Sequence, residues 1–236
     1  MTHVADHTVR VEHCLLTAVD QPWPFALERA AEIEAHWLQR SAENPKFFNG
    51  RLRMLSSYAL AGDTLTGECL ETDFKQFLYW RETGEPDAGV TDVFASALIW
   101  SSDGYLLLGR QTPGNINAGL TYLPGGFIDP RDVGGDGQID IAASSEREVA
   151  EETGLGPDVL TRQPGFLLGF CGNQLSIAVE YCCALTADAT RERARAHLAQ
   201  DRDPELADVV LVRQHSDLAG VAMPAYAQLL LASVLT

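Results

Sequence analysis

The chain has 236 residues, of which 46% are hydrophobic and 21% charged, enough for one large domain or a catalytic domain with a smaller companion. This composition excludes disordered and collagen-like chains. With 33 acidic and 17 basic residues, the formal charge of −16 disfavours nucleic acid and anionic membranes as partners.

The sequence carries no sign of export or membrane insertion. The stretch MTHVADHTVRVEHCLL lacks a basic beginning, an uninterrupted apolar run and a cleavage site. No apolar stretch approaches the roughly 20 residues that cross a bilayer. The five cysteines are odd in number and lack CxxC spacing, which favours a reduced protein. We therefore expect a cytoplasmic protein.

The turn-rich stretch RETGEPDAG (81–89) predicts a boundary between an N-terminal α+β extension, residues 1–88, and a second domain, residues 89–236. Polar and apolar residues alternate over 7–16, which predicts a strand. Apolar residues at helical spacing after Pro24 predict a helix over 24–40. The remaining elements expected in the extension are strands over 51–62 and 64–72 and a short helix over 73–81.

The second part begins with two apolar runs that predict a hairpin over 93–110. Glycine and aspartate residues over 129–138 predict a loop, and a helix is expected from Asp140, its N-cap, to Gly154. The other expected elements are strands near 121–128, 166–170, 175–185 and 208–212 and helices over 190–200 and 224–235. This order predicts an α/β fold with helices on both sides of a mixed sheet.

The helix over 140–154 carries an unusual set of charges. Glu148, Glu151 and Glu152 fall on one arc, and Arg147 lies four residues before Glu151. Carboxylates this close repel one another unless a cation neutralises them, and Mg²⁺ is the natural partner of carboxylate oxygens beside a phosphate. The face expected to pack on the sheet carries small residues: Ala142, Ala143, Val149 and Ala150.

The string REVAEETGL (147–155), together with PGGFI (124–128), resembles the signature box of the Nudix hydrolases. The resemblance covers residues 92–236 and implies an α/β/α sandwich around a mixed sheet. It also implies a pyrophosphohydrolase that depends on a divalent metal, Mg²⁺ or Mn²⁺, and acts on a nucleoside diphosphate linked to another group.

The resemblance also implies roles for residues of this chain. The metal-binding set would comprise Gly125, Glu148, Glu151 and Glu152, and Arg147 would orient the box. Gly126 matches the second glycine of the motif, which we assign to substrate binding. Two glutamates outside the box are candidates for the general base, Glu205 and Glu180, and Glu205 is preferred because a loop before a strand can reach the site. Arg110, at a strand end, is a candidate phosphate ligand, although most such arginines are surface residues.

The box departs from the family pattern in its upstream half. The family places 13 residues between its glycine and its arginine, whereas 20 separate Gly126 from Arg147. Counting back eight residues from Arg147, the position of the first family glutamate holds Ile139, and Asp140 is one residue away. The seven extra residues are either a surface insertion or a loop that folds over substrate.

The segment 44–80 resembles the leading part of a Nudix branch that hydrolyses UDP-sugars to UMP and a sugar 1-phosphate. Other substrates that remain open are ADP-ribose and dinucleotides, and a Nudix domain that binds nucleotides without hydrolysis is a third alternative. Many members of the family dimerise, so a homodimer is also considered.

Overall fold

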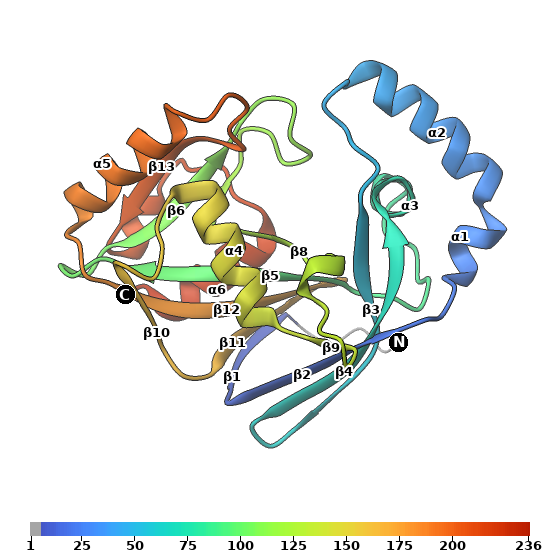
Figure 1. The fold of residues 1–236 in the computed structure, drawn as a ribbon, viewed down its shortest axis with the longest axis horizontal. Coiled ribbons are helices and arrows are strands. Elements are labelled where there is room, and N and C mark those ends of the chain that lie inside the picture. The colour runs from blue at the N-terminus through green and yellow to red at the C-terminus, as the bar shows by residue number, and fades with distance from the viewer. Residues whose placement is uncertain (1–5) are drawn as a thin grey trace.

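Nine strands form a larger sheet and four form a second sheet in the computed structural model, which describes residues 6–236 (Figure 1). The larger sheet contains β1 (His7–Val11), β5 (Asp92–Trp100), β6 (Leu106–Gln111), β7 (Thr121–Tyr122), β8 (Gly125–Phe127), β10 (Leu160–Arg162), β11 (Phe166–Cys171), β12 (Gln174–Cys183) and β13 (Leu206–Val212). The second sheet contains β2 (His13–Val19), β3 (Arg51–Ala61), β4 (Thr64–Asp73) and β9 (Gln138–Ile139). The helices are α1 (Pro24–Glu28), α2 (Ala30–Glu43), α3 (Phe74–Glu82), α4 (Ile141–Thr153), α5 (Ala187–Leu198) and α6 (Ala225–Val234).

Both sheets are mixed. The long strands of the larger sheet follow the order β1-β11-β12-β5-β6-β13, in which β12 and β5 run parallel and the other neighbours antiparallel. The second sheet follows the order β3-β4-β2-β9, and its only parallel pair among the described strands is β2 with β4.

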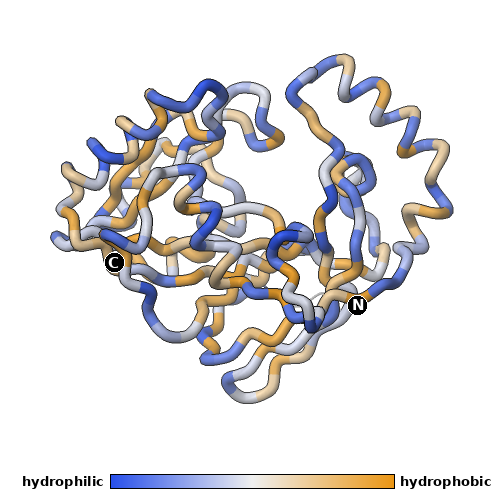
Figure 2. Tube along the Cα trace, in the orientation of Figure 1, coloured by the Kyte–Doolittle hydropathy of each residue, from blue (hydrophilic) through white to orange (hydrophobic). Residues whose placement is uncertain are grey.

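The central strand β5 is buried on both faces, because successive side chains of a strand point to opposite sides. Val93 and Ala95 pack in the core beneath α4 and α5, whereas Phe94 and Leu98 pack in the core beneath α6, where they join Leu230. Figure 2 shows hydrophobic residues concentrated along these central strands. The predicted α/β/α sandwich with a mixed sheet, preceded by an α+β extension, is confirmed.

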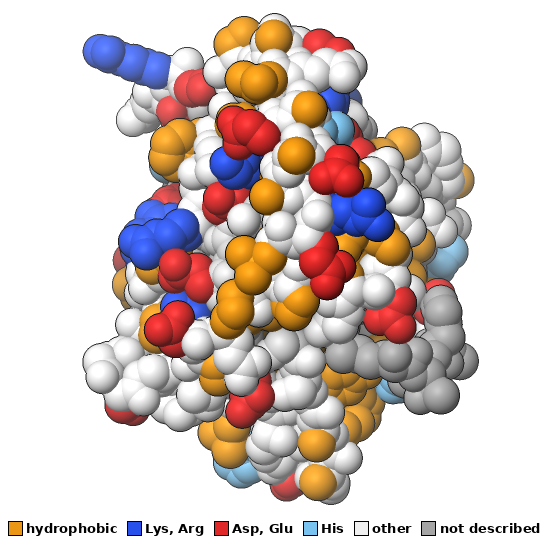
Figure 3. Space-filling model, turned by 90° about the vertical axis from the view of Figure 1, so that its right-hand side faces the viewer, with side chains coloured by type: hydrophobic (Ala, Val, Ile, Leu, Met, Phe, Trp, Pro, Cys, Tyr) orange, Lys and Arg blue, Asp and Glu red, His pale blue; other side chains and the backbone are white. Residues whose placement is uncertain are grey.

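A separate aromatic core stabilises the N-terminal part. Trp23, Ile33, Phe77 and Trp80 pack together beneath α2 and α3. Helix α3 begins at a capping box, because Asp73 accepts the Gln76 amide and Gln76 in turn accepts the Asp73 amide. On this side of the molecule, apolar side chains are scattered among charges of both signs (Figure 3).

The N-terminal part is joined to the rest of the chain through both sheets. Strand β1 pairs with β11 of the larger sheet, and β2 pairs with β9, which belongs to the second part of the sequence. The division at 88/89 stays a prediction, and residues 1–5 lie outside the described residues. All five cysteines are free, and no helix of residues 6–236 is long and apolar enough to cross a membrane.

Two predicted elements are each divided in the structure. The strand expected over 7–16 is β1 and β2, because the amides of Glu12 and His13 both bond the Asp63 carbonyl and turn the chain between sheets. The helix expected over 24–40 breaks at Arg29, whose backbone leaves helical geometry. The first of these divisions depends on a tertiary contact that local periodicity does not report.

The buried face of α4 differs from the small-residue face that was predicted. Ala143 and Ala150 are exposed, and Ser144 and Ser145 are fully buried instead. Their hydroxyls are satisfied, since Ser144 donates to Asp132 at 3.0 Å and Ser145 donates to a β5 carbonyl at 3.3 Å. The helix is thus fixed to its surroundings by hydrogen bonds as well as by apolar packing.

Candidate active site

Helix α4 is held at both ends and presents its glutamates to β8. Asp140 caps its first turn by accepting the Ala143 amide at 3.0 Å, and Gly154 ends it in the left-handed conformation. A Cβ atom on Gly126 would lie 2.6 Å from the carboxyl carbon of Glu148. A glycine is therefore required here so that the carboxylate can lie directly against the strand.

The three box glutamates occupy different environments. Glu152 is buried, 4% exposed, and its Oε2 accepts the Gly125 amide at 3.0 Å. The Glu148 side chain is mostly buried, and the Glu151 side chain is 53% exposed. The helix therefore directs Glu148 and Glu152 toward β8, whereas Glu151 is more exposed to solvent but still shares Arg147 with Glu148.

Electrostatic repulsion links Glu148 and Glu152 to Glu205, which lies just before β13. Burial raises the pKa of Glu148 to about 7, against the opposing effect of Arg147, and Glu205 raises it further. Burial raises the pKa of Glu152 well above its ordinary value, with added repulsion from Glu205 and Glu148. Burial is the main cause that raises the pKa of Glu205, and the negative charge of Glu151 is the second. Without a cation, these three carboxyl groups therefore hold protons more tightly than exposed glutamates do, and a bound cation would favour their ionised form.

Arg147 forms ion pairs with several acidic residues around the glutamates of α4. Its Nη2 lies 3.1 Å from each carboxylate oxygen of Asp132, and its Nη1 bonds Glu148 and lies 3.3 Å from Glu151. Asp132 is 3% exposed at its side chain and also accepts the Asp129 amide at 3.0 Å. Arg147 therefore contacts Asp132 and Glu148 in addition to Glu151, its neighbour four residues along the helix.

Asp132, rather than Ile139 or Asp140, stands at the position of the first glutamate of the family pattern. Five residues separate Gly126 from Asp132, which is the family spacing between the glycine and its first acidic residue. Ile139 is a buried residue of β9, and Asp140 is the exposed N-cap of α4. The signal was present in the sequence, but counting back from Arg147 crossed the insertion and missed it.

The seven extra residues thus lie between Asp132 and Arg147. They form a turn that closes with the Gly134 amide on the Gln138 carbonyl at 2.8 Å, followed by β9, where Ile139 pairs with Leu16 of β2. None of residues 133–139 lines either of the two cavities described here. The insertion extends the second sheet, so its position does not support a loop folded over substrate.

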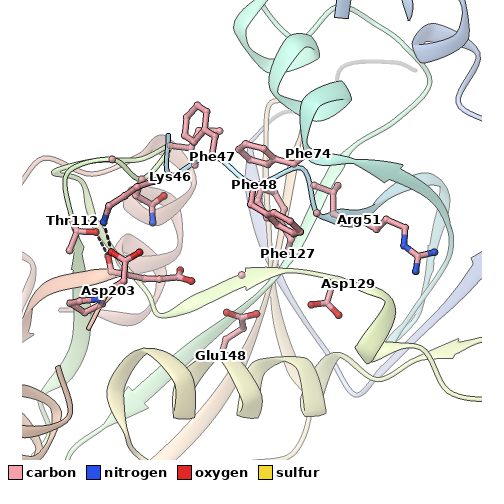
Figure 4. Close-up of a pocket in the computed structure, with 18 of the residues that line it drawn as sticks. Lys46, Phe47, Phe48, Arg51, Phe74, Thr112, Phe127, Asp129, Glu148 and Asp203 are labelled. Carbon is pink, nitrogen blue, oxygen red and sulfur yellow. Dashed lines mark hydrogen bonds and ion pairs between the residues drawn. The ribbon is translucent and has the colours of Figure 1, made fainter. Parts of the chain in front are cut away.

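A cleft of about 490 Å³ separates the N-terminal part from the glutamates (Figure 4). One wall is aromatic and comprises Phe48, Phe74 and Phe127, with Glu148 below them. On the other side, Lys46 forms an ion pair with Asp203, which joins the N-terminal part to the loop that carries Glu205. The cleft therefore combines an apolar wall, cationic side chains and the carboxylates.

Of the remaining predicted residues, Glu205 lines this cleft and the adjoining smaller cavity. Glu180 lines neither cavity and lies 3.1 Å from Arg10 on β1. Arg110 is exposed on β6 opposite Asp208 and also lines neither cavity. The positions of Arg110 and Glu180 give no support to a role in the reaction.

The donor set suits a hard divalent cation, because Glu148, Glu152 and Glu205 offer only carboxylate oxygens and repel one another without a counterion. Within residues 6–236, no three His, Cys, Asp or Glu side chains already stand at metal-binding spacing. Arg147 and the Gly125 amide each engage one of these carboxylates. Metal binding would therefore compete with contacts that the glutamates already make.

The NUDIX domain family model matches residues 91–215, which is more than half of the chain. The chain belongs to the NUDIX domain family. It is thus a Nudix hydrolase, an enzyme that acts on phosphoric anhydride bonds, and such enzymes generally use divalent metals. None of the curated protein sequences matches this chain significantly.

Several solved structures are similar to this chain. The MutT protein of Methanosarcina mazei Go1 is 23% identical, with a TM-score of 0.38 over 58% of this chain and 86% of that one. The Nudix hydrolase RenU of M. smegmatis is 16% identical, with a TM-score of 0.39 over 61% and 86%. The NUDIX domain of Shewanella oneidensis NrtR, solved with ADP ribose, is 17% identical, with a TM-score of 0.39 over 66% and 94%.

Proposed function

We propose that this protein hydrolyses the pyrophosphate bond of a nucleoside diphosphate linked to a sugar, with a UDP-sugar as the first candidate and Mg²⁺ or Mn²⁺ as the metal. The observation that carries the proposal is the convergence of Glu148, Glu152 and Glu205 where the large cleft meets a second, polar cavity. A substrate with two different halves joined by a pyrophosphate suits this arrangement.

Glu148 and Glu152 would hold the metal, with a carbonyl oxygen from Gly125 and with Glu151 as an outer member of the set. The metal, when bound, neutralises the pyrophosphate oxygens and makes a bound water easier to deprotonate. Glu148 is suited to this role because Gly126 allows its carboxylate to approach the strand closely.

In the reaction, the oxygen of a water molecule bonds to one phosphorus atom, and the bridging oxygen leaves with the other phosphate. The products of a UDP-sugar are UMP and a sugar 1-phosphate. Glu205 would accept the water proton, and its raised pKa makes it a better base than an ordinary exposed glutamate. Its place on the border of both cavities supports this assignment.

Arg147 positions the site and does not contact substrate. It bonds Glu148 on one side and Asp132 on the other, so it fixes the direction in which the Glu148 carboxylate points. Asp132 in turn is fixed by Ser144 and by the Asp129 amide. Asp132 therefore acts through Arg147 and would not itself contact the reacting atoms.

The nucleoside half would occupy the large cleft. Phe48 is 81% exposed, although an apolar side chain of this size is usually buried, and it stands near Phe127. A base can stack on such a wall, and the nearby Gly126 would lie beside the phosphates. The free thiols support a reducing, cytoplasmic compartment, and a homodimer remains part of the proposal.

The proposal is tested by product analysis with a panel of UDP-sugars, ADP-ribose, NADH, dinucleoside polyphosphates and nucleoside triphosphates, with and without Mg²⁺ or Mn²⁺. We expect metal-dependent cleavage of UDP-sugars and its loss in Glu152→Gln. Preferred turnover of ADP-ribose or dinucleotides would replace the substrate class. Saturable nucleotide binding without turnover, unaffected by Glu152→Gln, would contradict catalysis and indicate a nucleotide sensor.

A further inference from the structure

A second cavity of about 110 Å³ lies beside the large cleft and shares Gly126 and Glu205 with it. Glu152 faces this second cavity, which is also lined by residues that the proposed reaction does not use. The most informative of these are Arg81, Asp92, Gln111, Asn117 and Gln174. They come from α3, β5, β6, the loop before β7, and β12, so five separate parts of the chain bring polar groups to one small space.

Asp92 is a buried carboxylate that is only partly satisfied. Its side chain is at the start of β5, the residue is 5% exposed, and its Oδ2 accepts a hydrogen bond from Gln174 at 2.9 Å. No donor of residues 6–236 bonds its other oxygen, Oδ1. Oδ1 is not one of the fully buried side-chain atoms without a partner among the described residues, so it is open to the cavity, where it can accept a hydrogen bond from a ligand hydroxyl group.

Arg81 brings a cation to the same cavity. Its Nη2 donates to the Asn117 side-chain oxygen at 2.7 Å, and Asn117 in turn donates to the Tyr122 hydroxyl at 3.1 Å. Among the described residues no carboxylate lies within ion-pair distance of Arg81. A guanidinium group has five N–H donors, so donors remain for a ligand.

The remaining wall of the cavity is apolar. Phe94 and Tyr226 pack edge to face with ring centres 4.8 Å apart, and both line the cavity. The cavity lining thus combines a carboxylate, a guanidinium group and side-chain amides with aromatic rings. Such a lining suits a ligand with hydroxyl groups on its rim and C–H groups on its faces. A sugar ring has this chemistry, whereas a nucleobase has a flat π surface and fewer donors.

We propose that this cavity, lined by Arg81 and Asp92, binds the sugar of the substrate, so that a hexose lies beyond the pyrophosphate and the nucleoside lies in the large cleft. The inference rests on the proposed function and specifies its substrate class. Asp92 accepts from sugar hydroxyls, Arg81 donates to them, and Asn117 and Gln174 hold these two side chains in place. The smaller volume of the cavity limits this half of the substrate to a small group.

The two reaction products separate the two subsites experimentally. The affinities of glucose 1-phosphate, UMP and inorganic phosphate are measured by calorimetry with Mg²⁺ for the wild type, Arg81→Gln and Asp92→Asn. Matched controls are Arg191→Gln and Asp188→Asn, an exposed ion pair on α5 that lines neither cavity. Asp92→Asn is close in shape to the native side chain, so it still tests the proposal where Arg81→Gln fails to fold.

We expect the affinity for glucose 1-phosphate to fall by about tenfold or more in both cavity variants, since each removes a hydrogen bond to a charged group. The affinities for UMP and inorganic phosphate should change little, and the controls should resemble the wild type. An equal loss of phosphate affinity would show that Arg81 binds the phosphoryl group instead, which overturns the proposal. Unchanged glucose 1-phosphate binding, or none in the wild type, also overturns it.

Turnover of the substrate panel by the same wild-type preparation distinguishes failure of the sugar subsite from failure of the proposed hydrolase function. Turnover combined with unchanged glucose 1-phosphate binding in the variants rejects the sugar subsite and leaves the hydrolase intact. Lack of turnover with every substrate rejects the proposed function itself.

Discussion

Arg147 and the buried Asp132 form a two-oxygen ion pair, with the arginine Nη2 atom 3.1 Å from both carboxylate oxygens. The same guanidinium group bonds Glu148, so one side chain connects a buried acid behind the helix to a carboxylate that faces the cleft. Asp132 lies 15 positions before Arg147, so the inserted turn does not prevent contact between the two side chains. The pair also leads to a test that separates Asp132 from its neighbour Asp140.

Asp132→Ala should lower the free energy of unfolding by about 3 kcal/mol, because Arg147 loses its two-oxygen partner and the Ser144 hydroxyl and the Asp129 amide lose their buried acceptor. Hydrolysis should also fall. Without Asp132, Arg147 is less firmly fixed and therefore orients the Glu148 carboxylate less well. Asp140→Ser is the matched control, because serine also caps a helix and should change stability by only a few tenths of a kcal/mol. Denaturant unfolding and kcat measure both effects; equal losses in the two variants would contradict the assignment.

Gly126→Ala should abolish most of the activity while the chain still folds. The added Cβ atom would lie 2.6 Å from the Glu148 carboxyl carbon, so the carboxylate must move away from the strand. Gly135→Ala is a suitable control, because no heavy atom lies within 4 Å of its added Cβ. Activity assays and thermal unfolding are the measurements. Normal activity in Gly126→Ala would show that the close approach of Glu148 to β8 is not needed.

Phe48→Ala should weaken nucleotide binding by about tenfold, which is the usual effect of losing one aromatic stacking surface. Stability should not change, because the side chain is 81% exposed. Leu38→Ala removes another exposed apolar side chain, 64% exposed and outside both cavities, and should affect neither property. The KM for the substrate and the affinity for UMP measure the effect. Equal KM values in Phe48→Ala and wild type would place the base elsewhere.

Asp92 predicts a dependence of stability on pH. Burial raises the pKa of its carboxyl group from 3.8 to about 6, so the folded state binds a proton more tightly than the unfolded state does. The contribution of this group to stability is therefore full below pH 4 and is lost as the pH rises through 6. Asp92→Asn should stabilise the protein at pH 7 by at most about 3 kcal/mol and have little effect near pH 4.

This prediction is checked by urea unfolding of the wild type and Asp92→Asn at several pH values from 4 to 7. The stability difference between the two proteins should grow with pH and become constant above about pH 7, where the carboxyl is fully ionised in both states. A difference that is the same at every pH would show that Asp92 does not carry this shifted pKa.

The sequence located helix α4 well, because caps, periodicity and charge are local properties of residues 140–154. It placed Glu148 and Glu205 among the site residues, and both line the cleft. It missed Asp132 because the inserted turn changes the spacing before Arg147. The two-residue strand β9 was not predictable, since it forms only by pairing with β2 from the other end of the chain.

The polar cavity illustrates a different limit of sequence analysis. Arg81 lies in the turn-rich stretch that indicated a domain boundary, and Asp92 begins an apolar strand, so neither carries a recognisable motif. Gln174 is more than 80 residues from Asp92 in sequence, yet their side chains bond at 2.9 Å. Only the pairing of β12 with β5 brings these groups together.

The most direct test of the central claim is a phosphorus NMR time course of UDP-glucose with the wild type and with Glu152→Gln, each with Mg²⁺ and with EDTA. The account predicts that the pyrophosphate signals of the wild type with Mg²⁺ are replaced by those of UMP and glucose 1-phosphate. EDTA should stop the reaction, and Glu152→Gln should slow it by about a hundredfold or more, since carboxylate ligands and metal together stabilise the transition state. Persistence of the pyrophosphate signals in the wild type, or equal rates in Glu152→Gln, would contradict the account.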